Sequence, residues 1–330
     1  MQEAVLTLKK FESNVVPFTP RAERQTQPGS LTLPDLAVRR ILLPFDFSTA
    51  SVELLRGIVS LATRTGASVH LLHVVDPGAL ADQDDRVAAM SEEMLKAWVQ
   101  RIVEGRVKVY VSVRVGRVVE EIIARGKATR ADLIVMSANC FSSPRSGSVR
   151  CVAERVSRDA SRPVLTIPAK CAESFAEGFD GFPVTNWKRI LVPIDFSEAA
   201  SRAIRYAAAI ALENRSSLLL AHAASERDSM HTGEDAAELT TAQTLERLRK
   251  WAENEVQFPI GFETSVWVGN CTFYRILSEA ARTQADLIVL PTQSCSWARR
   301  FRSDSITDGV LRHAACPVLS INKNIKEIEQ

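Results

Sequence analysis

The sequence predicts an α/β protein of two tandem doubly wound domains, each a five-stranded parallel sheet with helices on both faces. Three observations predict this fold class. Short, wholly apolar runs alternate with stretches of helical periodicity, as expected of strands that helices cover on both faces. Three blocks of sequence recur in the same order along the chain. The length of 330 residues is sufficient for two domains that each bury a core.

The repeat is the strongest of these observations, because its blocks match in residue type and in order. Each block combines a strand pattern with the residues that follow or precede it, so each copy is one structural unit. The pairs are RILLPFDFS (40–48) with RILVPIDFS (189–197), ADLIVM (131–136) with ADLIVL (285–290), and RPVLTI (162–167) with CPVLSI (316–321).

The first copy begins with the apolar strand Ile41–Pro44, after which Ser48 is a good N-cap for a helix. Apolar residues then recur at helical spacing from Val52 to Ala62, and Gly66 supplies a left-handed end to that helix. The same reasoning predicts the elements that follow. They are strand Ser68–Val75, helix Asp85–Val103, strand Lys108–Val115, helix Val118–Thr129, strand Leu133–Met136, helix Val149–Asp159 and strand Val164–Ile167.

The sequence of the second copy predicts the same alternation of strand and helix after its own first strand. Five parallel strands in each copy require right-handed crossovers through the helices. The predicted elements are helix Glu198–Leu212, strand Ser217–Ala223, helix Asp235–Glu255, strand Glu263–Val268, helix Thr272–Thr283, strand Leu287–Leu290, helix Ser305–His313 and strand Val318–Ile321.

Composition shifts predict the domain boundaries. Residues 1–36 hold four prolines and no periodicity, which indicates a flexible N-terminal tail. Residues 169–186 contain two glycines and a proline and are predicted to be the linker. The domains are therefore expected at 38–168 and 187–322, followed by a C-terminal tail at 323–330.

Charge and composition exclude several classes of partner and location. A net charge of +2 gives no general reason to expect nucleic acid or a membrane surface as a partner. No segment has the 18 or so apolar residues that a membrane span needs. The N-terminus lacks the pattern of a signal peptide, and the six cysteines form no CxxC pair. We therefore expect a cytoplasmic protein with reduced thiols.

At this point the repeated blocks are similar to the universal stress protein (UspA) family in a tandem two-domain form. The strand-to-aspartate turns at 44–46 and 193–195, the ADLIV strand, the GRVVEEII segment (116–123) and the RHAACPVL segment (312–319) carry the resemblance. It covers about residues 38–168 and 187–322. The resemblance implies a Rossmann-like, adenine nucleotide alpha hydrolase-like fold. It also implies that the final strands of the two domains pair with each other.

The resemblance also implies where ATP would bind. In ATP-binding members, a G-x-x-G-x9-G-[S/T] stretch after the fourth strand holds the phosphates, because glycine lets backbone N–H groups approach them closely. None of the six glycine positions holds glycine here, and only Ser305 keeps the last position. Tight ATP binding of the usual kind is therefore not expected in either copy. The motif positions are Ser137, Cys140, Arg150 and Cys151 in the first copy and Pro291, Ser294, Asp304 and Ser305 in the second.

Asp46 and Asp195 follow the first strand of each copy, where ATP-binding members hold the adenosine end. One interpretation makes each carboxylate a turn residue that accepts backbone N–H groups beside a helix N-terminus. The other makes it a surviving nucleoside contact. Cys140 and Cys151 leave two interpretations open as well, small side chains that fill a vacated site or neighbouring thiols that sense oxidation. A thiol titration under native conditions distinguishes the last two.

The function predicted from these residues is a non-enzymatic stress-response protein that acts through protein partners. No nucleophile–base–orienter set and no metal-binding pair occurs in the sequence, and His73 and His222 are expected to be structural. The expected partners are the two domains for each other, an unidentified protein and a possible second copy, with no nucleic acid and no membrane. No cofactor is expected. The alternative is an ATP-binding sensor, with magnesium and weak hydrolysis, that uses a non-standard phosphate site.

Overall fold

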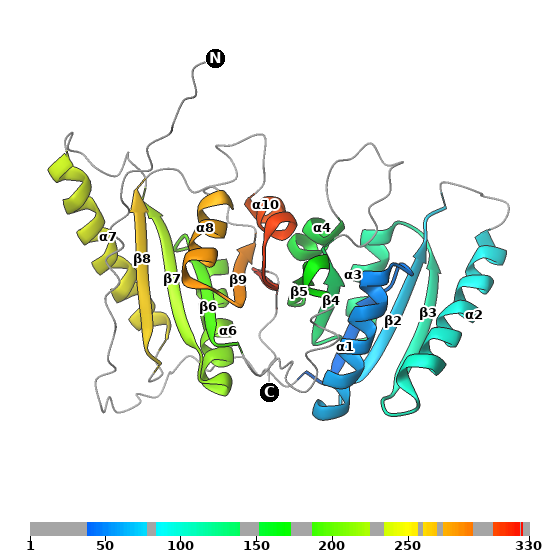
Figure 1. Cartoon of the computed structure of the whole chain (residues 1–330). Helices are drawn as coiled ribbons and strands as arrows, with labels where there is room; N and C mark the ends of the chain where they lie inside the picture. The colour runs from blue at the N-terminus through cyan, green and yellow to red at the C-terminus, as the bar shows by residue number, and fades with distance from the viewer. Residues whose placement is uncertain are drawn as a thin grey trace, which may run out of the picture.

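The computed structural model describes residues 38–77, 84–138, 152–172, 187–224, 234–256, 260–268, 273–292, 306–323 and 325. Two halves of like architecture lie side by side, and their strands form one ten-stranded sheet (Figure 1). The predicted N-terminal tail and most of the predicted linker lie outside the described residues. Residues 169–172, at the start of that linker, form one helical turn.

In each half, strands alternate with helices as the sequence predicts. The elements of the first half are β1 (Arg40–Pro44), α1 (Thr49–Thr65), β2 (Ser68–Val75), α2 (Asp84–Val103), β3 (Val109–Val115), α3 (Val118–Ala128), β4 (Leu133–Ser137), α4 (Val152–Asp159) and β5 (Val164–Ile167). Those of the second half are β6 (Arg189–Ile194), α6 (Glu198–Asn214), β7 (Ser217–Ala224), α7 (Glu234–Glu255), β8 (Phe262–Val268), α8 (Phe273–Thr283), β9 (Leu287–Thr292), α10 (Ile306–His313) and β10 (Val318–Asn322).

The predicted boundaries agree with these elements to within one or two residues where both can be compared. The predicted starts of three helices, at Val149, Thr272 and Ser305, lie outside the described residues. The predicted strand Leu287–Leu290 is too short, because β9 continues through Pro291 to Thr292. A proline can be accommodated there because the ladder between β9 and β6 ends at Ile288, so the end of β9 pairs only with β10.

Local sequence signals account for the ends of α1. Ser48 is its N-cap, with its side-chain oxygen accepting a hydrogen bond from the Ser51 backbone N–H at 3.2 Å. Gly66 ends the helix in the left-handed conformation, with φ of 70°. Helix α6 begins in the same way at Ser197 but ends at Arg215, whose left-handed φ of 56° costs a non-glycine residue about 1–2 kcal/mol.

The sheet order is β3-β2-β1-β4-β5-β10-β9-β6-β7-β8. Within each half all strand pairs are parallel, which confirms the predicted doubly wound fold class. Among the strands that the structure describes, the one antiparallel pair is β5 with β10, which aligns Leu165 with Leu319 and joins the two halves. Both strands are buried along their whole length.

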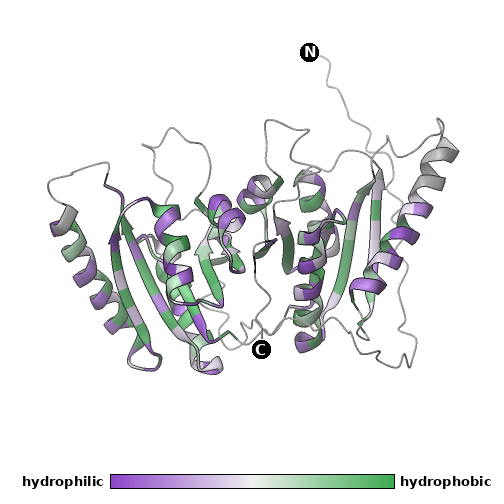
Figure 2. Ribbon diagram, turned by 180° about the vertical axis from the view of Figure 1, so that it is seen from behind, coloured by the Kyte–Doolittle hydropathy of each residue, from purple (hydrophilic) through white to green (hydrophobic). Residues whose placement is uncertain are grey.

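Helices cover both faces of the sheet, and the buried side chains form one large cluster and two smaller ones. The large cluster lies on the face of α1, α2, α6 and α7 and runs without a break from one half into the other. The opposite face has a separate cluster in each half, under α3 and α4 and under α8 and α10. Figure 2 shows the apolar strands between helices whose outer surfaces are hydrophilic. No helix in the described ranges is long and apolar enough to cross a bilayer.

Side chains from the second half cap helix α4 of the first half. The Asn322 side-chain amide donates to the backbone carbonyls of Ser157, Arg158 and Ala160 at the end of α4. Thr292 Oγ1 donates to the Ser157 carbonyl at 3.1 Å. The Ser157 and Ala160 carbonyls are buried and that of Arg158 is partly buried, and carbonyls at a helix end have no donor within the helix. The contact therefore ties the two halves together with hydrogen bonds that are largely shielded from water.

We predict that Asn322→Ala lowers the free energy of unfolding by about 1–3 kcal/mol, because it leaves buried carbonyls without a donor. Urea denaturation followed by circular dichroism measures this change. Asn214→Ala is the control, since the Asn214 amide caps a carbonyl of its own helix at Ile210. An Asn322→Ala variant that loses no more stability than the control would contradict the prediction.

Candidate functional site

Each half has a candidate site at the carboxyl ends of its strands, where the strand order reverses. Doubly wound sheets bind ligands at such a switch point, because the loops on either side lead away in opposite directions. The switch point lies between β1 and β4 in the first half and between β6 and β9 in the second. Each of these pairs is in register over only two residues, so the strands separate before Asp46 and Asp195.

In the first half, Asp46 is held by the start of the following helix. Its Oδ1 accepts hydrogen bonds from the Ser48 backbone N–H at 3.1 Å and from the Ser48 hydroxyl at 2.6 Å. The Ser51 hydroxyl donates to the same oxygen at 2.5 Å. Three donors on one carboxylate oxygen fix the direction of the side chain. This geometry is that of a turn carboxylate beside a helix N-terminus, and a nucleoside contact by Asp46 stays a prediction.

In the second half, Asp195 has fewer donors. Its Oδ1 accepts from the Ser197 backbone N–H at 3.0 Å and from the Ser197 hydroxyl at 2.5 Å. Ala200 stands where the first half has Ser51, so the third donor is missing. Asp195 Oδ2 is buried and has no hydrogen-bond partner among the described residues. A buried carboxylate oxygen without a donor is costly, and it is an acceptor that a ligand hydroxyl or amine would satisfy.

The residue after each aspartate has an unusual backbone conformation. Phe47 and Phe196 have φ of 62° and 59°, in the left-handed region that glycine favours. Each ring packs against a histidine of the next strand, Phe47 on His73 and Phe196 on His222, with ring centroids 4.7 Å apart in both halves. Strain of about 1–3 kcal/mol at such a position persists only where surrounding contacts hold it. No local sequence signal predicts this conformation, because neither residue is glycine.

His73 and His222 each form a hydrogen bond with a backbone carbonyl just before the turn. Nδ1 of His73 lies 2.8 Å from the Phe45 carbonyl, and Nδ1 of His222 lies 2.7 Å from the Ile194 carbonyl. Since a carbonyl only accepts, Nδ1 carries the proton in each ring. Burial lowers the pKa of His73 below its ordinary 6.5, although the Phe45 carbonyl and the Asp46 charge oppose this shift. Among the described residues no group of three or more potential ligands could hold a metal ion.

Two of the eight phosphate-motif positions lie in described residues, and both are in strands. Ser137 is the buried last residue of β4 and aligns with Ile167 of β5. Pro291 aligns with Ile321 of β10 and has no N–H to offer a phosphate. The other six positions, and with them the predicted meeting of two thiols, lie outside the described residues. These six are Cys140, Arg150, Cys151, Ser294, Asp304 and Ser305.

A different pair of cysteines lies near the joint between the halves. The Cys171 thiol donates to the Ala315 carbonyl at 3.1 Å, beside buried Cys316. Burial raises the pKa of the Cys171 thiol and raises that of Cys316 to about 12. Both thiols are therefore protonated at neutral pH, which makes them poor nucleophiles. No pattern in the sequence singles these two cysteines out, because only the fold brings residues 171 and 316 together.

The fold and the site define a tandem α/β protein with an aspartate turn at the switch point of each half. A family model, the universal stress protein family, matches residues 37–168 and 186–322. Two such matches cover most of the chain, which therefore belongs to the universal stress protein family in tandem form.

Solved structures have the same fold. One is a universal stress protein from Archaeoglobus fulgidus DSM 4304, with a TM-score of 0.58 and 21% identity, covering 86% of this chain and 96% of that one. Another is a protein of unknown function from Pseudomonas aeruginosa PAO1, with a TM-score of 0.53 and 18% identity, covering 87% and 94%. No curated protein matches the chain. At these identities the likeness to the solved structures concerns the fold.

The His73 pKa predicts a pH dependence of stability. Because the folded chain binds this proton less tightly than the unfolded chain, stability is lost as pH falls below about 6.5. We expect His73→Asn, which keeps a donor near Nδ1 but does not titrate, to lose less stability between pH 7 and pH 5 than the parent protein. Urea unfolding at several pH values measures the difference. His70, whose pKa burial also lowers, contributes separately, and a His70→Asn,His73→Asn variant should be flatter still. Equal slopes in parent and His73→Asn would refute the assignment.

Proposed function

We propose that this chain is a non-enzymatic universal stress response protein that acts through protein partners, in the cytoplasm. Its two domains pair with each other within the chain, and its phosphate loops have degenerated in both. The observation that carries the proposal is Pro291 at the first glycine position of the second copy. It lies within β9 and lacks an N–H, so that position cannot donate to a phosphate.

The first copy supports the same proposal through Ser137 and Asp46. Ser137 is buried at the end of β4, where a phosphate loop would need bare backbone. One oxygen of Asp46 already accepts three hydrogen bonds from Ser48 and Ser51. A ligand that used this oxygen would have to displace protein donors. Both features favour a structural role for the turn.

The intramolecular pairing of β5 with β10 supports a role in protein binding. Pairing covers the final strands, which would otherwise be open edges, and a tandem chain makes the contact at high effective concentration. The outer edges β3 and β8 then remain at the two ends of the sheet. An unidentified protein, or a second copy of the chain, would approach from there or from the helix faces.

One observation favours the alternative, an ATP-binding and weakly hydrolysing sensor. Asp195 Oδ2 is a buried acceptor without a partner among the described residues, and a ribose hydroxyl could donate a hydrogen bond to it. If nucleotide binds at all, the second copy is the better candidate, because Ala200 leaves Asp195 with one donor fewer than Asp46 has.

Isothermal titration of the full chain with ATP and magnesium tests the proposal. We expect no saturable heat at micromolar ATP, because the lost backbone contacts weaken phosphate binding by about 1.5–3 kcal/mol each. Micromolar affinity would overturn the proposal. If that affinity then falls at least tenfold in Asp195→Asn but stays unchanged in Asp46→Asn, the alternative and its location in the second copy are supported.

A further inference from the structure

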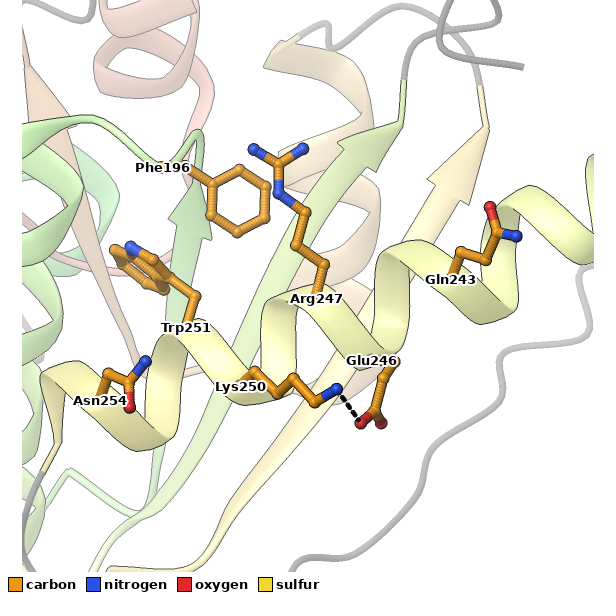
Figure 3. A pocket seen from close by; sticks show the side chains of 7 residues that line it. All are labelled: Phe196, Gln243, Glu246, Arg247, Lys250, Trp251 and Asn254. Atoms are coloured by element: carbon orange, nitrogen blue, oxygen red, sulfur yellow. Dashed lines mark ion pairs between the residues drawn. The ribbon is translucent and has the colours of Figure 1, made fainter. Parts of the chain in front are cut away.

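A pocket of about 630 Å³ lies beside the Asp195 turn, on the outer side of helix α7. Figure 3 shows that Phe196 enters it from the turn, whereas all the other lining side chains come from one stripe of α7. The α7 residues are Gln243, Glu246, Arg247, Lys250, Trp251 and Asn254. Among the described residues, the lining comes from helix α7 and from the residue after Asp195, and none of it comes from β9.

The floor of the pocket is aromatic. The rings of Phe196 and Trp251 meet edge to face, with centroids 5.5 Å apart and planes at 89°. Both rings are half-buried and pack against the large core cluster, which holds them in place. A rigid pair of rings offers a flat ligand apolar area at low entropic cost.

Arg247 lies over the Phe196 ring and has no acidic partner among the described residues. The Arg247 guanidinium lies 4.4 Å above the centroid of the Phe196 ring, within range of a cation–π contact. Among the described residues no carboxylate forms an ion pair with Arg247, whereas the neighbouring Lys250 pairs with Glu246 at 3.2 Å. The pocket therefore carries one net positive charge. Among the described residues the guanidinium also donates no hydrogen bond, so its N–H groups remain available to an anion.

The first half has matching aromatic residues at the equivalent positions but a different residue in place of the arginine. Phe47 and Trp98 occupy the places of Phe196 and Trp251, and buried Leu95 matches buried Leu248. Met94, which is 50% exposed, stands where the second half has Arg247. A cation also adjoins the tryptophan of the first half, where Arg101 Cζ lies 5.8 Å from the Trp98 ring centroid, but only the second half has one over the phenylalanine of the turn among the described residues.

We propose that this pocket binds a small aromatic anion, a flat ring carrying one carboxylate or a similar group. The ring lies against Trp251 and the part of Phe196 that Arg247 and His222 leave uncovered, and the anionic group accepts hydrogen bonds from Arg247. The amides of Gln243 and Asn254 at the two ends of the stripe add neutral polar contacts. Since the ligand would touch Phe196, it would bind next to the strained turn at Asp195 without using the phosphate loop. The protein would then respond to a small molecule independently of ATP.

Isothermal titration of the full chain with 2-naphthoate tests this site. We expect saturable binding to one site, and a loss of affinity of about tenfold or more in Arg247→Met, which removes hydrogen bonds to a charged group. The uncharged analogue 2-naphthalenemethanol and the non-aromatic cyclohexanecarboxylate should each bind far more weakly than 2-naphthoate to the parent protein. Circular dichroism verifies that Arg247→Met, at an exposed position, is folded.

Met94→Ala is the matched control, because it changes the same helix position in the first half. It should leave 2-naphthoate binding unchanged. The proposal is overturned if the parent protein does not bind 2-naphthoate, if Arg247→Met binds it within twofold of the parent, or if Met94→Ala weakens binding as much. Equal affinity for 2-naphthalenemethanol would overturn it as well. None of these outcomes depends on ATP binding, so the test is independent of the proposed function.

Discussion

The antiparallel pairing of β5 with β10 is the contact on which the rest of the structure depends. It turns two five-stranded sheets into one and lets the large core cluster continue from half to half. Asn322 and Thr292 then supply donors to the buried carbonyls at the end of α4. The first half has Pro168 and Ala138 at the corresponding positions, neither of which has a side-chain donor. The two copies are therefore not interchangeable at their joint.

The copies also differ around the aspartate turn, although its frame is the same in both. Each has a strained phenylalanine that packs on a histidine, and each histidine binds a strand-end carbonyl. The differences are in the side chains that touch this frame. Ser51 donates a third hydrogen bond to Oδ1 of Asp46, whereas Ala200 offers none to Oδ1 of Asp195. The other oxygen of Asp195, Oδ2, is buried without a partner among the described residues. The two turns therefore share one backbone arrangement and differ in the polar groups around it.

Much of the fold could be predicted from the sequence because its signals are local. The apolar run of β1, the Ser48 cap and the left-handed Gly66 each act within a few residues, so the predicted boundaries agree closely with the structure. The prediction was wrong where the end of a strand depends on a neighbouring strand that is distant in the sequence. β9 continues through Pro291 because only β10 pairs with the end of that strand, and no local rule reports which neighbours a strand has.

For the candidate sites, the sequence by itself determined the two aspartates, the repeat that relates them and the absence of glycine from the phosphate motif. These follow from residue identity at fixed spacing. Only the tertiary structure decided that Asp195 has a buried oxygen without a donor among the described residues, and that Arg247 stands over Phe196. Burial and ring contacts join residues about 50 positions apart, because packing brings α7 against the turn after β6. The periodicity of one helix or strand does not indicate which side chains of another element pack against it.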